Sequence, residues 1–143
     1  MVLFSLGRAF RRMRAIVHIL IVDDHAGVRT LIRELLAESF EPVPGRTVTF
    51  AECGNAEQAL AVIDAQRPDL VTVDLRMPGM NGLECVRRLR AKLPLACIVV
   101  VTQFGNETLR HRARFAGADS MVCKDDLNQL PIVTLNYLKR EVK

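Results

Sequence analysis

Short runs of apolar residues alternate along the chain with stretches in which apolar positions recur every three or four residues. The runs at 16–22, 47–53, 70–73, 95–101 and 120–123 have strand length and are rich in β-branched residues. The stretches at 26–40, 56–66, 83–90, 106–115 and 131–140 have helical spacing. Strands that alternate with helices predict an α/β fold, in which a parallel sheet is covered on both faces.

The first helical stretch shows the clearest amphipathic pattern. The side chains that we expect to face the core are Val28, Leu31, Ile32, Leu35, Leu36 and Phe40. The last helical stretch is weaker, because its β-branched residues at 132–134 are poor helix formers. We expect it to begin near Pro131, since proline is tolerated in the first turn of a helix.

Polar residues stand where the apolar runs end. Asp23 and Asp24 follow the first run, Asp74 follows the third, Thr102 follows the fourth and Lys124 follows the fifth. Parallel sheets bind ligands outside the carboxyl ends of their strands. We therefore expect these five side chains to gather at one edge of the sheet.

Such a group of side chains has a recognisable chemistry. Three carboxylates without nitrogen ligands favour a hard cation such as Mg²⁺. A hydroxyl and an ammonium group beside them would hold phosphoryl oxygens, as phosphoryl transfer onto a carboxylate requires. Taken singly, each residue has an ordinary explanation, such as a helix cap, a turn former or a solvated charge. Only their combination, in this order, indicates a site.

The net charge of +4 belongs to the N-terminal segment. Residues 1–22 contain four arginines and no acidic residue, and the rest of the chain is neutral. We interpret 1–15 as a basic N-terminal extension and 16–143 as one domain, and we expect no direct contact with nucleic acid. The favoured interpretation of 1–14 is an extension without fixed structure. The alternative is a short basic amphipathic helix on an anionic membrane or a partner protein.

The four cysteines indicate a reducing compartment. They are scattered, with no Cys-x-x-Cys pair and no histidine at the spacing of a zinc ligand. We expect buried free thiols and a cytoplasmic protein. No apolar run approaches the roughly 18 residues that a bilayer-spanning helix needs.

Four motifs give the chain a family resemblance. They are Ile-Val-Asp-Asp-His at 21–25, Val-Asp-Leu-Arg-Met-Pro-Gly-Met-Asn-Gly at 73–82, Val-Thr at 101–102 and Gly-Ala-Asp with the later Lys at 117–124. Over about 16–138 the chain resembles the CheY-like receiver domains of bacterial two-component response regulators. The resemblance implies a flavodoxin-like (βα)5 fold with strand order 2-1-3-4-5.

The resemblance also implies a function. Asp74 would accept a phosphoryl group from a phosphohistidine on a sensor histidine kinase or a phosphotransfer protein, and Thr102 and Lys124 would contact the phosphoryl oxygens. The protein would signal to a downstream protein target, or form a homodimer, through the surface of the fourth and fifth helices and the fifth strand. It would not be an enzyme toward other substrates.

A magnesium site is implied in the same way. Asp24 would bind Mg²⁺ directly and Asp23 mainly through water. Asp74 and the backbone carbonyl of Arg76 would complete the protein ligands.

Two alternatives remain open. One is a receiver fragment of a DNA-binding transcriptional regulator, because Asp-Asp-His at 23–25 and Lys-Asp at 124–125 resemble receivers that precede helix-turn-helix output domains, although nothing after Lys124 resembles a DNA-reading helix. The other is a metal-dependent phosphatase with an aspartyl nucleophile. This alternative is weaker because such enzymes usually carry a second acid where this chain has Arg76.

Two positions depart from the family pattern. Met121 stands where the family usually has an aromatic switch residue, so we do not expect an aromatic side chain to swing there. Gln103 and Phe104 follow Thr102, where the family usually begins with a small residue. Their bulk should narrow the access of water and phosphoryl donors to Asp74.

We therefore expect a long-lived aspartyl phosphate, and Gln103→Ala should shorten its lifetime because it opens the path for water. The measurement is the decay of phosphorylated protein after removal of the donor. Hydrolysis within seconds that is equally fast in the parent and in Gln103→Ala would contradict this expectation.

Overall fold

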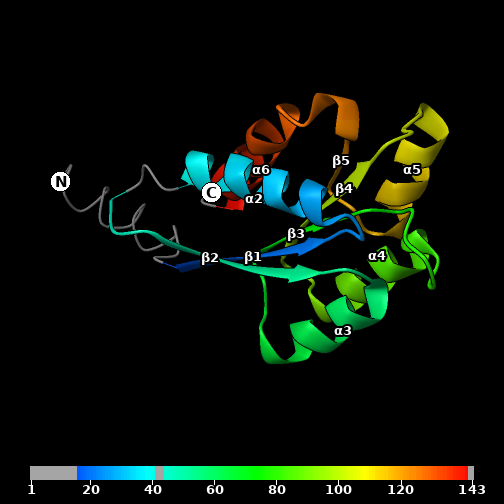
Figure 1. The fold of residues 1–143 in the computed structure, drawn as a ribbon, viewed down its shortest axis with the longest axis horizontal. Coiled ribbons are helices and arrows are strands. Elements are labelled where there is room, and N and C mark those ends of the chain that lie inside the picture. The colour runs from blue at the N-terminus through cyan, green and yellow to red at the C-terminus, as the bar shows by residue number, and fades with distance from the viewer. Residues whose placement is uncertain (1–15, 41–43, 142–143) are drawn as a thin grey trace.

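The computed structural model describes residues 16–40 and 44–141, so the expected basic extension at 1–15 lies outside the described residues. Five parallel strands form one sheet in the order β2-β1-β3-β4-β5, which confirms the predicted flavodoxin-like topology (Figure 1). The strands are β1 (Ile16–Val22), β2 (Thr47–Cys53), β3 (Leu70–Val73), β4 (Cys97–Thr102) and β5 (Ser120–Cys123).

Helices cover both faces of the sheet. They are α2 (Ala26–Phe40), α3 (Ala56–Ala65), α4 (Gly82–Lys92), α5 (Glu107–Ala116) and α6 (Gln129–Glu141), and the short 3-10 helix η1 (Lys124–Asp126) joins β5 to α6. In Figure 1, α2 and α6 lie side by side above the sheet and α3 lies below it. The helices α4 and α5 pack their buried residues into the same core layer as α3.

Side chains of β1 alternate between the two core layers. Ile19 and Ile21 pack toward α2 and α6, whereas Leu20 and Val22 pack toward α3 and α4. The central strands β3 and β4 are buried along their whole length. Continuous apolar runs in the sequence are the consequence of this burial on both faces.

The turn after β3 is made rigid by its glycines. Gly79 has a φ of 98°, which a residue with a side chain rarely adopts. A Cβ at Gly82 would lie 2.4 Å from the backbone of Leu75, so only glycine allows α4 to begin this close to the turn. The Asn81 side chain caps α4 by accepting a hydrogen bond from the backbone N–H of Leu83.

Three details of the sequence prediction were wrong. Leu31 is 45% exposed, because α2 buries a narrower stripe at Ile32, Leu36 and Phe40. Strand β4 begins at Cys97, and Leu95 belongs to the preceding turn and is 76% exposed. Helix α6 begins at Gln129 rather than near Pro131, which still lies in its first turn, where its missing N–H costs nothing.

The four cysteines are free, as expected. Cys53, Cys85 and Cys97 are buried and Cys123 is partly exposed. Burial raises the pKa of Cys85 to about 11, so this thiol stays protonated and unreactive at neutral pH. Among the residues described, no helix has both the length and the apolar character needed to cross a membrane.

Arg90 connects chain segments at the amino ends of the strands, on the side of the sheet opposite the acidic strand ends. Its guanidinium donates hydrogen bonds to four backbone carbonyls, those of Leu93, Pro94, Ala96 and Gly117. It also pairs with Asp119 at 2.6 Å, and the same carboxylate oxygen accepts the backbone N–H of Ile98. One side chain thus joins α4 to the starts of β4 and β5.

Arg90→Ala should lower the free energy of unfolding by about 2–4 kcal/mol, because several partly buried acceptors lose their donor at once. The control is Arg88→Ala on the same helix, which removes an exposed pair with Glu84 and should cost less than about 1 kcal/mol. Urea denaturation of both variants is the measurement. Equal losses in the two variants would contradict a special role for Arg90.

Candidate functional site

The register of the sheet brings the polar strand ends together. Val22 of β1 is aligned with Val73 of β3, so Asp23 and Asp74 leave neighbouring strands at the same level. Thr102 at the end of β4 is aligned with Cys123 of β5, and Lys124 comes next. The convergence that the sequence predicted therefore results from parallel pairing.

The three acidic side chains form one cluster. Asp23, Asp24 and Asp74 each offer a carboxylate oxygen, and these oxygens lie within 4.8 Å of one another. Asp23 and Asp74 are buried, whereas Asp24 is exposed. Like charges this close repel strongly where water is scarce, so the cluster needs a cation. Its oxygen-only donors fit a hard divalent ion.

Lys124 supplies positive charge to the cluster. Its Nζ donates a hydrogen bond to Asp74 Oδ2 at 3.0 Å and lies 2.9 Å from Asp23 Oδ2 in an ion pair. Burial lowers the pKa of Lys124, but the contacts with the two carboxylates raise it more, and the net pKa lies above its usual value. The ammonium group therefore stays charged at neutral pH and bridges two buried acids.

Backbone N–H groups hold the other oxygens of the two buried carboxylates. Asp74 Oδ1 accepts the N–H of Arg76 at 3.0 Å, and Asp23 Oδ1 accepts the N–H of His25 at 2.8 Å. In each carboxylate, one oxygen accepts a backbone N–H from the following turn and the other contacts Lys124. Both buried carboxylates are therefore held in a fixed orientation.

Thr102 is buried at the end of β4, and its Oγ1 has no hydrogen-bond partner among the residues that the structure describes. An unpartnered buried hydroxyl costs free energy unless a ligand supplies an acceptor. Thr72, inside β3, has an unpartnered hydroxyl too, so this property alone does not mark a site. The position of Thr102 beside β5 and Lys124 distinguishes it.

Two functional contacts were missed from the sequence. Arg29 donates a hydrogen bond to the backbone carbonyl of Asp23 at 2.6 Å and pairs with Glu52, which ties the turn after β1 to β2. The Arg76 guanidinium lies over the ring of Phe104, 4.8 Å from its centroid. The pairs Arg29–Glu52 and Arg76–Phe104 have no local sequence pattern, because each joins residues that are more than 20 positions apart.

The positions that depart from the family pattern differ in their exposure to water. Met121 is buried in the core layer of α3, α4 and α5. Gln103 and Phe104 are both exposed, and Phe104 carries the Arg76 guanidinium. The narrowing of access by Gln103 stays a prediction.

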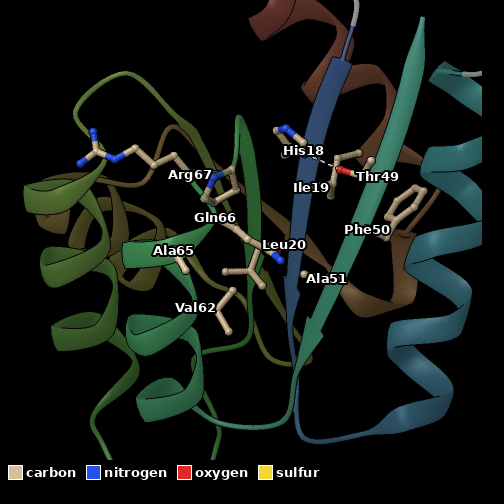
Figure 2. A pocket seen from close by; sticks show the side chains of 11 residues that line it. His18, Ile19, Leu20, Thr49, Phe50, Ala51, Val62, Ala65, Gln66 and Arg67 are labelled. Atoms are coloured by element: carbon tan, nitrogen blue, oxygen red, sulfur yellow. Dashed lines mark hydrogen bonds between the residues drawn. The ribbon is translucent and has the colours of Figure 1, made fainter.

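A hollow of about 540 Å³ lies elsewhere, beside the middle of β1 and β2. Figure 2 shows Leu20, Ala51 and Val62 facing each other across it, between the two strands and α3. A hydrogen bond between His18 and Thr49 lies at one side (Figure 2). None of the expected site residues lines this hollow, so the hollow and the acidic cluster are separate features.

Comparison with known proteins agrees with the fold. The family model described as "Response regulator receiver domain" matches residues 19–133. The nitrate/nitrite response regulator protein NarL of Escherichia coli (strain K12) is 38% identical over 107 residues, which cover 75% of this chain and 47% of NarL. Sporulation initiation phosphotransferase F of Bacillus subtilis (strain 168) is 30% identical over 122 residues, which cover 84% of this chain and 92% of that protein.

Among solved structures, a two-component response regulator of the LuxR family from Aurantimonas sp. SI85-9A1 is similar, with a TM-score of 0.73 and 31% identity over 86% of this chain and 85% of that one. The chain spans about half the length of NarL but nearly all of the sporulation phosphotransferase. The family model covers most of the chain, from β1 into α6. This chain therefore belongs to the receiver domains of response regulators.

Proposed function

We propose that Asp74 is the phosphoacceptor of this receiver and that it takes its phosphoryl group from a phosphohistidine. Response regulator receivers interact with histidine kinases or phosphotransfer proteins, and the donor here would be one of these. The observation that carries the proposal is the contact of Lys124 with Asp74, 3.0 Å apart, within a cluster of three acids. Such a cluster with one ammonium group fits phosphoryl transfer onto a carboxylate.

In the proposed step, a carboxylate oxygen of Asp74 forms a bond to phosphorus while the bond between phosphorus and the donor nitrogen breaks. Charge then spreads over the three remaining phosphoryl oxygens. The Lys124 ammonium would neutralise part of that charge, and the Thr102 hydroxyl would donate a hydrogen bond to one oxygen. The backbone N–H of Arg76 holds the carboxylate in place during the attack.

Mg²⁺ is the proposed cofactor. Asp24, which is exposed, would bind it directly and Asp23 mainly through water, while Asp74 and the backbone carbonyl of Arg76 would complete the protein ligands. When bound, the ion would add positive charge to the acidic cluster. The all-oxygen donor set supports a hard cation over zinc or copper.

The phosphorylated state would signal through the surface of α5, β5 and α6. Thr102 ends the strand that leads into α5, and Lys124 starts the short helix that leads into α6. Movement of either residue would therefore shift the start of the helix that follows it. Phe115 on α5 is 91% exposed and Ile132 on α6 is 53% exposed. These apolar side chains support a protein target or a second copy of the chain as the partner.

Two organisations of the whole protein remain open. Residues 16–143 could act as a single receiver through protein contacts, as the near-complete coverage of the sporulation phosphotransferase supports. They could equally be the receiver of a DNA-binding regulator, as the half-length match to NarL supports. The coding sequence beyond Lys143 distinguishes the two. In both cases 1–15 is an extension, and the free thiols favour a cytoplasmic location.

An aspartyl phosphatase is the weaker alternative. Arg76 stands two residues beyond Asp74, where a second acid would be needed. Its side chain lies on Phe104 and offers no general acid or base. The function that we propose is therefore signalling, with chemistry limited to its own phosphorylation and dephosphorylation.

Asp74→Asn should abolish phosphorylation by acetyl phosphate and Mg²⁺, because a neutral amide cannot replace the carboxylate nucleophile. Intact-protein mass spectrometry measures the gain of one phosphoryl group. The control is Asp64→Asn, which removes a more exposed acid that pairs with Lys92. Labelling that survives in Asp74→Asn would refute Asp74 as the acceptor.

Lys124→Met should destabilise the metal-free protein by about 2–4 kcal/mol, because two buried carboxylates lose their shared cation. Because its pKa is raised, Lys124 is charged at neutral pH, and its stabilising effect is lost only as the pH rises through that pKa. Denaturation is therefore measured at neutral pH. Calorimetric titration should show Mg²⁺ binding several-fold more tightly, since no ammonium competes for the carboxylates. Lys92→Met is the control, and a Lys124→Met protein that matches it in both measurements contradicts the proposal.

A further inference from the structure

The side chains of Arg76 and Phe104 join two loops at the carboxyl edge of the sheet. Arg76 lies in the turn after β3, two residues beyond Asp74, and Phe104 lies in the turn after β4, two residues beyond Thr102. The guanidinium carbon lies 4.8 Å from the ring centroid. Phe104 is nevertheless 60% exposed, so the ring is held on one side by the arginine and faces water elsewhere.

The backbone of Arg76 lies directly beside the Asp74 carboxylate. Its backbone nitrogen lies 3.0 Å from Asp74 Oδ1, and the flexible side chain starts one atom further along the chain. Among the residues described, the guanidinium makes no ion pair with the three acids, and Lys124 bridges the two buried ones. In the resting protein the arginine is therefore a cation held beside the site but not engaged in it.

Phosphorylation would change this balance. It replaces one carboxylate charge with a phosphoryl group of higher charge and three acceptor oxygens. A contact between an exposed guanidinium and an aromatic ring is weak, whereas hydrogen bonds between a guanidinium and phosphoryl oxygens are charge-assisted and stronger. The planar fork of arginine also matches the geometry of phosphoryl oxygens.

We propose that the Arg76 guanidinium is a ligand of the phosphoryl group on Asp74 and that the Phe104 ring is its resting place in the unphosphorylated protein. The inference rests on the proposed function of Asp74. Addition of the phosphoryl group draws the guanidinium away from the ring and frees Phe104. Arg76 thus acts twice, through its backbone N–H in the resting state and through its side chain in the phosphorylated state.

Release of Phe104 has a path to the signalling surface. The next residue, Gly105, packs so closely that a Cβ there would lie 2.9 Å from Met121 Cε and 3.7 Å from Thr102 Cγ2. Asn106 then caps α5 by accepting a hydrogen bond from the N–H of Leu109. A shift of Phe104 therefore moves the segment that begins α5 against β5.

The chain has no tryptophan, so Phe104→Trp places a single fluorescent reporter at the ring position. Tryptophan retains the contact with Arg76, because it is the best aromatic partner of a cation. The probe is beryllofluoride with Mg²⁺, which stands in for the phosphoryl group. The tryptophan emission should shift to longer wavelength as the ring loses the arginine and gains water.

In the double variant Phe104→Trp with Arg76→Gln, the emission should begin at the longer wavelength and show no further shift. The glutamine keeps the backbone N–H and carbonyl of residue 76 and replaces the guanidinium with a shorter, neutral amide. Arg87→Gln, which replaces an exposed arginine paired with Glu84 on α4, is the matched control and should retain the shift.

Beryllofluoride affinity gives the second readout, followed by fluorine NMR. Arg76→Gln should weaken binding about tenfold through the loss of a charge-assisted ligand, while Phe104→Leu should bind as tightly as the parent or about twofold more tightly. Unaltered emission while bound fluorine resonances are present overturns the inference, as does equal affinity in Arg76→Gln and the parent. If the parent itself shows no bound resonances, the proposed function of Asp74 fails and the inference fails with it.

Discussion

Two buried carboxylates on neighbouring strands set the central constraint of this structure. Asp23 and Asp74 lie at the same level of the sheet with almost no exposure to water, and their repulsion is compensated by the ammonium group of Lys124. Ion pairs thereby connect the ends of β1, β3 and β5. With the exposed Asp24 beside them, these two acids form a cluster that could also hold a metal ion.

The fold serves this constraint by placing rigid elements around it. Parallel pairing fixes the relative heights of β1, β3, β4 and β5, and the glycine-containing turn after β3 brings α4 against the chain beyond Asp74. At the other edge of the sheet, Arg90 joins α4 to the starts of β4 and β5. Rigidity at that edge leaves the loops at the carboxyl edge as the parts that can respond to a change of charge.

Those loops contain the features that make this receiver individual. Strand β5, which leads to Lys124, holds the buried Met121 and not an aromatic residue. An aromatic ring is present instead in the turn after β4, where Phe104 lies beneath the Arg76 guanidinium. Membership of the family follows from the receiver-domain model that matches residues 19–133 and from the sequence identity with NarL and the sporulation phosphotransferase over most of this chain.

Local sequence was sufficient to determine the strands, most helix limits and the order of polar residues at the strand ends, because periodicity and turn chemistry act between near neighbours. It misplaced Leu31 and Leu95, since the width of a buried stripe and the start of a strand depend on what packs against them. The resemblance to a family supplied the strand order and the residue roles. Only the tertiary structure revealed the hydrogen bonds of Arg90 and the contact of Arg76 with Phe104, because such contacts join distant segments through space. The sequence thus determined which groups stand at the ends of the strands, and the three-dimensional packing decided which of them touch.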